Sequence, residues 1–147
     1  MKNKLKLLVN ATIESFNVYT KEVTKTSKVH NLIVDVGLDE AIDNGLSNIG
    51  HMAIGTDNTA VVAGDTQLGT EEKREAVSPT NEGTGIREYD VTFLFSSGES
   101  FSIVEAGLFD SPTASGSIML NRLVFAGHDV DVDNGVRVII TITLTAV

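Results

Sequence analysis

The chain of 147 residues has no cysteine, no tryptophan and only two prolines, and aromatic residues make up 5% of it. Without cysteine it can form neither disulfides nor thiolate metal sites. No apolar run approaches the roughly 20 residues that a membrane-spanning helix needs. The length is that of one domain, and a chain of this size can bury a core without covalent cross-links. We therefore expect a single domain over residues 1–147 and no membrane partner.

The formal net charge of −9 is unevenly distributed. Residues 1–28 contain six Lys and two Glu, which gives +4, and the remainder carries five basic and eighteen acidic residues, which gives −13. This acidic body argues against nucleic acid as a partner, because phosphate binding needs clustered Lys and Arg. Two interpretations of Lys2, Lys4 and Lys6 stay open. They could contact an acidic surface, including another copy of the chain, or lie solvated on the outer face of a strand.

Alternation of apolar and polar residues predicts strands along most of the chain. The pattern is clearest in Val136–Val147, where every second residue is apolar, and in Ile86–Phe95, where Tyr89, Val91, Phe93 and Phe95 occupy every second position. The central stretch Phe101–Phe125 is typical of a β-hairpin, with Phe101, Ile103, Ala106 and Leu108 in an inward row. Gly107 in its first arm indicates a bulge or a close backbone approach.

Weaker signals complete the predicted fold. A hairpin is expected from Asn10–Tyr19 and Val23–Val34, and short strands from His51–Gly55 and Lys73–Pro79, followed by a turn at Thr80–Gly85. Apolar residues four positions apart predict one short helix near Leu38–Leu46. About seven to nine strands predict an all-β, antiparallel β-sandwich of the jelly-roll or immunoglobulin-like type, in which residues 1–34 form a basic arm or hairpin.

The acidic turn with Asp129, Asp131 and Asp133 differs from a calcium loop in two places. Asn134 stands where the sharp turn needs glycine, and Ile140 stands where a bidentate glutamate is needed. We expect this turn to be a solvated strand edge, and no metal.

Residues that could support catalysis are scattered. His30, His51 and His128 form no closely spaced pair, and no GxSxG, GxGxxG or Walker-type loop is present. We expect no cofactor and no enzymatic activity. Glu105 is unusual because it lies within the apolar run IVEAGLF, and we expect it to pair with Arg122 across the hairpin.

The longest irregular segment is Thr56–Thr70. Loops of this length in a compact domain are usually functional or make contacts. The candidate interaction residues are therefore Asp57, Asn58 and Asp65 in this loop, together with Lys2, Lys4 and Lys6 in the basic arm.

Four stretches stand out in order along residues 30–147. They are HNLIVDVGLDEAIDNGL, HMAIGTDNTAVVAGDTQLGTEEKR, SFSIVEAGLFDSPTASGSIMLNRLVFAG and a final strand that alternates with threonine. In this order they resemble small virion structural proteins and tail-fibre modules of tailed bacteriophages. The resemblance does not separate capsid-decoration, head-fibre, neck and tail-fibre roles.

The resemblance implies a non-enzymatic protein of the virion, assembled in the cytoplasm of the host bacterium. Its partners would be other copies of itself, with a homotrimer expected before a dimer, and virion proteins such as the major capsid or tail proteins. The alternative function is a receptor- or glycan-binding module of a tail fibre. Exposed aromatic residues would favour the alternative, and most of the Phe and Tyr residues here fall in strands whose core would bury them.

Overall fold

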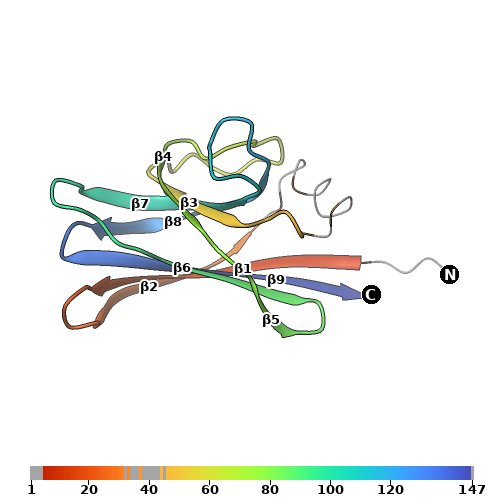
Figure 1. The fold of residues 1–147 in the computed structure, drawn as a ribbon, viewed down its shortest axis with the longest axis horizontal. Helices are drawn as coiled ribbons and strands as arrows, with labels where there is room; N and C mark the ends of the chain where they lie inside the picture. Colours follow the sequence, from red (N-terminus) through yellow and green to blue (C-terminus); the bar gives the residue numbers. More distant parts are fainter. Residues whose placement is uncertain (1–4, 32, 34–36, 38–43, 45, 147) are drawn as a thin grey trace.

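The computed structural model describes residues 5–31, 33, 37, 44 and 46–146. Nine strands in this part of the chain form two antiparallel sheets (Figure 1). The strands are β1 (Leu5–Asn17), β2 (Val23–Asn31), β3 (His51–Gly55), β4 (Glu71–Ala76), β5 (Thr80–Gly83), β6 (Ile86–Phe93), β7 (Phe101–Phe109), β8 (Met119–Val130) and β9 (Asn134–Ala146). The five-stranded sheet has the order β2-β1-β9-β6-β5 and the four-stranded sheet the order β4-β3-β7-β8. The expected all-β sandwich is confirmed.

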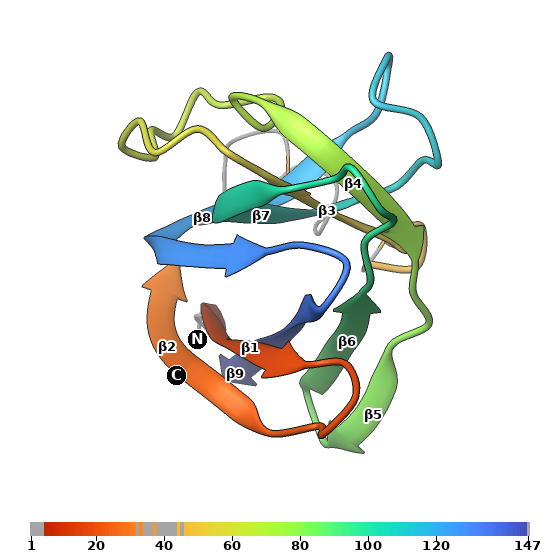
Figure 2. The same cartoon turned by 90° about the vertical axis from the view of Figure 1, so that its left-hand side faces the viewer.

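Successive hairpins of the chain belong to alternate sheets. Each of the hairpins β1–β2, β3–β4, β5–β6 and β7–β8 stays within one sheet, and the chain changes sheets between hairpins. Strand β9 then returns to the centre of the five-stranded sheet and pairs with β1 from Asn17↔Asn134 to Leu5↔Ala146. On one side of the molecule β2 curves across the gap between the sheets and contacts β8 (Figure 2).

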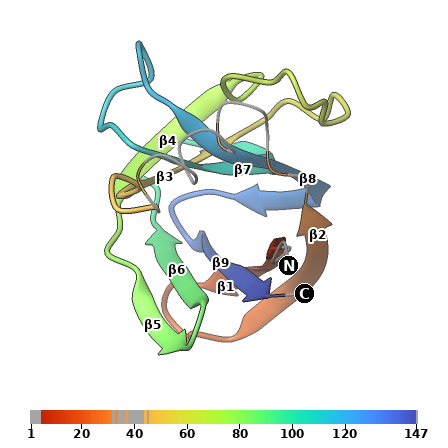
Figure 3. The same ribbon diagram turned by 90° about the vertical axis from the view of Figure 1, so that its right-hand side faces the viewer.

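The core consists of the inward rows of both sheets. In β9, Val136, Val138, Ile140 and Ile142 are at most 1% exposed, whereas the residues between them are half-buried. The predicted alternation of the last strand is confirmed. This strand lies between β1 and β6 (Figure 3), and its inward row belongs to the same core cluster as residues of both neighbours.

The four-stranded sheet is buried on both of its faces over β3, β7 and the first half of β8. The inner face contributes Ile103, Ala106 and Leu108 to the main core, as predicted. On the outer face, a second apolar cluster consists of Ala53, Leu68, Phe109 and Met119. A strand that is buried on both faces needs no polar alternation, which explains the continuous apolar run IVEAGLF.

Several predicted boundaries were wrong. Thr80–Gly83 is strand β5 rather than a turn, because its backbone pairs with β6, and the reversal occurs at Gly83–Gly85, where both glycines have positive φ. The strand expected at Lys73–Pro79 is shifted toward the N-terminus and forms β4. The helix expected near Leu38–Leu46 lies mostly outside the described residues. No helix in the described ranges is long and apolar enough to cross a membrane.

Candidate functional site

A buried ion pair joins the central hairpin. Glu105 on β7 is opposite Val124 on β8, and Arg122 is opposite Gly107, so Glu105 and Arg122 are diagonal neighbours on the outer face of the sheet. Arg122 Nε donates to Glu105 Oε2 at 2.9 Å. The two side chains are 3% and 0% exposed. The pairing expected across the hairpin is therefore confirmed.

Glu105 also holds both ends of the loop that follows β3. Its Oε1 accepts hydrogen bonds from the backbone N–H of Asp57 at 3.2 Å and of Thr70 at 2.8 Å. Its Oε2 accepts a further one from the backbone N–H of Gly69 at 2.9 Å. A buried carboxylate must be paired and hydrogen-bonded to offset its lost hydration. The loop main chain supplies most of that compensation.

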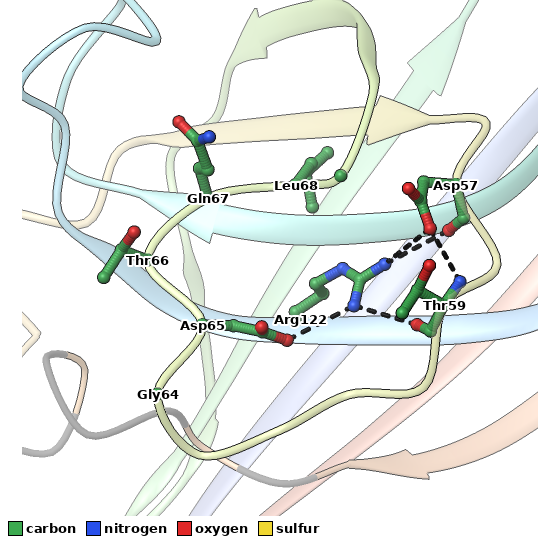
Figure 4. A pocket seen from close by; sticks show the side chains of 9 residues that line it. Asp57, Thr59, Gly64, Asp65, Thr66, Gln67, Leu68 and Arg122 are labelled. Atoms are coloured by element: carbon green, nitrogen blue, oxygen red, sulfur yellow. Dashed lines mark hydrogen bonds and ion pairs between the residues drawn. The ribbon is translucent and has the colours of Figure 1, made fainter.

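Arg122 holds the middle of the same loop (Figure 4). Its Nη1 donates to Thr59 O at 3.0 Å and to Asp65 Oδ2 at 3.2 Å, and its Nη2 donates to Asp57 O at 3.2 Å. Burial lowers the pKa of the guanidinium, but the hydrogen bonds and charges of Glu105 and Asp65 outweigh it, so the pKa is raised overall. Arg122 therefore stays charged, and it forms ion pairs with three carboxylates.

The three loop residues proposed from the sequence have different surroundings. Asp57 Oδ1 accepts a hydrogen bond from the Thr59 backbone N–H at 2.6 Å. Hydrogen bonds from Thr59, and then the charge of Arg122, lower the pKa of Asp57. Asp57 and Asp65 thus meet at Arg122, whereas Asn58 between them is exposed to solvent.

An apolar anchor supports this ion-pair network. Leu68 is 3% exposed and packs in the second apolar cluster. A Cβ at Gly107 would lie 3.3 Å from Leu68 Cδ2 and only 2.6 Å from Asn121 O. The glycine therefore marks a close approach, as the sequence predicted, because a side chain here would displace the neighbouring strand and the loop.

Arg74 secures the neighbouring loop between β7 and β8. Its guanidinium lies 3.9 Å above the centre of the Phe109 ring. Its Nη1 donates to Ser111 O at 2.7 Å and to Ser117 Oγ at 3.1 Å, while Glu71 accepts from Nε and Nη2. One arginine thus joins β4 to the connection of the central hairpin.

A hollow of about 300 Å³ remains between the Thr56–Thr70 loop and Arg122. The Asp57 and Asp65 carboxylates in its lining pair with Arg122, and the backbone N–H groups of Asp57 and Gly69 donate to Glu105. These contacts hold the loop against the four-stranded sheet.

A second buried polar group connects the two sheets. His128 on β8 is 0% exposed, and its Nδ1 and Nε2 lie 2.5 Å from Ser15 Oγ on β1 and 2.8 Å from Ser27 Oγ on β2. Burial, and then the positive charge of Lys25, lower the pKa of His128 to about 4, against a smaller opposite effect of Asp129.

The remaining candidates lie apart from the Arg122 network. Lys2 and Lys4 fall outside the described residues, and Lys6 is exposed on β1, opposite Thr145. In the acidic turn, Asp131 Oδ1 accepts hydrogen bonds from the backbone N–H groups of Asp133 and Asn134, both at 2.9 Å. Over the described ranges, no three His, Asp or Glu residues gather in a group that could hold a metal ion.

Sequence reasoning missed the main-chain part of the network. The N–H groups of Gly69 and Thr70 and the carbonyl of Thr59 carry no side-chain signature. The available signal was an acid and a base inside two apolar strands, since buried charges must be paired.

The fold and these contacts define an all-β sandwich with a surface loop held by a buried ion-pair network. No protein-family model matches the chain, no curated protein matches it, and no solved structure matches it.

Proposed function

We propose that this protein is a non-enzymatic structural component of a tailed-bacteriophage virion. In this role it associates with copies of itself and docks on other virion proteins, such as the major capsid or tail proteins. The proposal rests on one observation: two of the sequence stretches that resemble phage proteins contact each other in the structure. The stretch His51–Arg74 supplies the loop, and Ser100–Gly127 supplies Glu105 and Arg122, so the two stretches form one structural unit.

The use of the charged side chains supports a structural role. Glu105 and Arg122 are buried and bind the loop, and His128 has no exposed surface through which it could reach a substrate. A rigid loop on a sandwich suits docking, because little conformational entropy is lost when a preorganised surface binds.

The distribution of exposed charge supports self-association. Lys6 on β1 and Lys28 on β2 are exposed toward the β2 edge of the five-stranded sheet, and Glu82 is exposed on β5 at the opposite edge. Contact between opposite edges of the sheets of neighbouring copies pairs unlike charges, and head-to-tail contacts form a ring when the rotation from copy to copy closes. We propose a homotrimer of this kind, with Asn58 and the Lys-rich arm available for particle contacts.

Mass spectrometry of density-purified particles from the source culture tests the virion role. The protein should be present in many copies per particle and should remain after nuclease and detergent washes. Its absence from purified particles, while it is abundant in the lysate, would refute the proposal.

Sedimentation of the purified protein tests self-association. A trimer is expected at low salt. It should dissociate as ionic strength rises, because exposed charges are screened beyond a Debye length of about 8 Å at physiological salt. The variant Lys28→Glu should weaken the trimer. Lys73→Glu is the control for a change in net charge, because Lys73 on β4 is already paired with Glu99 in the connection between β6 and β7. A monomer at low salt and high concentration would contradict intrinsic assembly.

A further inference from the structure

The five-stranded sheet and the Arg122 loop belong to opposite layers of the sandwich (Figure 1). A second hollow lies on the outer face of the five-stranded sheet. Its volume is about 580 Å³, and it is lined by residues of β1, β6 and β9, by Lys21 in the turn between β1 and β2, and by Val23 at the start of β2. It is shallow and open to solvent. A ligand in such a site lies on the sheet rather than inside the protein.

An aromatic ring forms part of the surface of this hollow. Phe16 on β1 is opposite Gly135 on β9, and a Cβ at Gly135 would lie 2.7 Å from Phe16 Cζ. The ring therefore lies directly over the backbone of the neighbouring strand, in space that only a glycine leaves open. Phe16 is half-buried, so part of the ring remains available to a ligand.

A bidentate ion pair stands beside the ring. Arg137 on β9 donates through Nε to Asp90 Oδ1 at 2.9 Å and through Nη2 to Asp90 Oδ2 at 2.5 Å. The two side chains are 43% and 33% exposed. Two parallel hydrogen bonds fix the planes of both groups. The register places Glu14 and Thr92 on either side of Arg137.

The chemistry of this surface selects among ligand classes. Two carboxylates, Glu14 and Asp90, offset two cations, Arg137 and Lys21, so an anion such as phosphate meets no net positive charge. A wholly apolar ligand would desolvate the ion pair without replacing its lost hydration. Sugar hydroxyls both donate and accept hydrogen bonds, which suits a rim of mixed donors and acceptors. The C–H face of a sugar ring packs on an aromatic surface.

We propose that this hollow binds a neutral saccharide, with Phe16 as the stacking surface and the Asp90–Arg137 pair as the hydrogen-bonding group. The inference goes beyond the virion role. A structural protein with a sugar site and a structural protein without one would behave alike in the particle and sedimentation experiments.

Amide chemical-shift titration of the full chain tests the site, with glucose, galactose, mannose and N-acetylglucosamine as separate probes. At least one probe should shift the amides of Phe16, Asp90 and Arg137 together. Phe16→Leu keeps the apolar packing on Gly135 and removes the ring, and it should weaken that binding about tenfold. Asp90→Asn should weaken it by a similar factor. Leu8→Ala is the control, because Leu8 is 41% exposed on β1, lies outside the hollow and should leave binding unchanged.

Three results would contradict a saccharide site in this hollow. If none of the four saccharides shifts these amides in the folded wild-type protein, the proposal is wrong. Binding that persists in both the Phe16→Leu and the Asp90→Asn variants would place the sugar elsewhere and also overturn it. Inorganic phosphate serves as the anionic probe, and binding of phosphate in preference to every sugar would show an anion site instead. Sugar affinity should change little with salt, because a neutral ligand gains nothing from long-range attraction.

Discussion

Arg122 Nε lies 2.9 Å from Glu105 Oε2 at a position where neither side chain is more than 3% exposed. The two residues belong to one hairpin, but most of their other hydrogen bonds go to the loop between β3 and β4. Loss of either residue would therefore affect a segment that is more than thirty residues away in sequence. The ion pair makes the loop and the sheet one structural unit.

The first prediction concerns the effect of leaving one of these charges unpaired. Glu105→Gln keeps the shape of the side chain but leaves the Arg122 guanidinium buried without its closest counter-charge. Breaking a buried pair in this way costs about 3–5 kcal/mol of unfolding free energy. Urea denaturation should show that loss. Asp90→Asn, which disrupts the half-exposed pair with Arg137, should cost about 1 kcal/mol or less.

The double variant Glu105→Gln/Arg122→Met separates pairing from packing. If the charges act as a pair, the double variant loses less stability than the sum of the two single variants. Additive losses, or a Glu105→Gln variant as stable as wild type, would show that the network contributes little.

The regular strands could be predicted because their sequence pattern has a local cause. β9 has one face against the core and one toward solvent, so Val138 and Ile140 alternate with Arg137 and Ile139. The Glu105–Arg122 pairing could be predicted for a related reason, since two charges in adjacent apolar strands must compensate each other.

The rest depends on contacts that leave no local pattern. The loop binds Glu105 through backbone N–H groups, which every residue but proline has, so its closure on the sheet could not be read from side chains. Thr80–Gly83 has the composition of a turn but forms β5, because β6 offers it an open edge. Burial of His128 requires β2 to curve toward β8, which is a property of the assembled sheets.

A second prediction concerns Gly55, the last residue of β3, where the loop leaves the sheet. A Cβ at Gly55 would overlap Thr70 O and Glu105 Oε1. Gly55→Ala should therefore separate the loop from Glu105 and cost about 1–3 kcal/mol in thermal or urea denaturation. Gly64→Ala is the matched control, since nothing lies within 4 Å of its Cβ position. Equal stability of the two variants would contradict the close approach.

The third prediction is a pH dependence that arises from His128. Its pKa is about 4 in the folded protein and 6.5 in the unfolded chain. The unfolded state therefore binds more protons between these values, so stability is complete above pH 6.5 and falls as the pH decreases toward 4. The difference of 6.5 − 4 = 2.5 pKa units corresponds to a loss of about 3 kcal/mol at the acid end.

Urea denaturation at a series of pH values above pH ~5 checks this prediction, because carboxyl groups titrate mainly below that range. His128→Gln should remove most of the slope, whatever its effect on absolute stability. His30→Gln alters an exposed histidine on β2 and should keep the slope. If the wild type and His128→Gln have the same slope, His128 is not the group responsible.

The last prediction tests whether the Thr56–Thr70 loop is part of the core rather than an independent surface segment. Leu68 is 3% exposed and packs with Phe109 and Met119, so Leu68→Ala should leave a cavity and cost about 2–5 kcal/mol. Val62 in the same loop is 56% exposed, and Val62→Ala should change stability by less than about 0.5 kcal/mol. Hydrogen exchange supplies the decisive measurement. The amides of Gly69 and Thr70, which donate to Glu105, should lose protection in Leu68→Ala and keep it in Val62→Ala. If these amides exchange rapidly in the wild-type protein, the loop is not held to the sheet by either its apolar anchor or its ion pair.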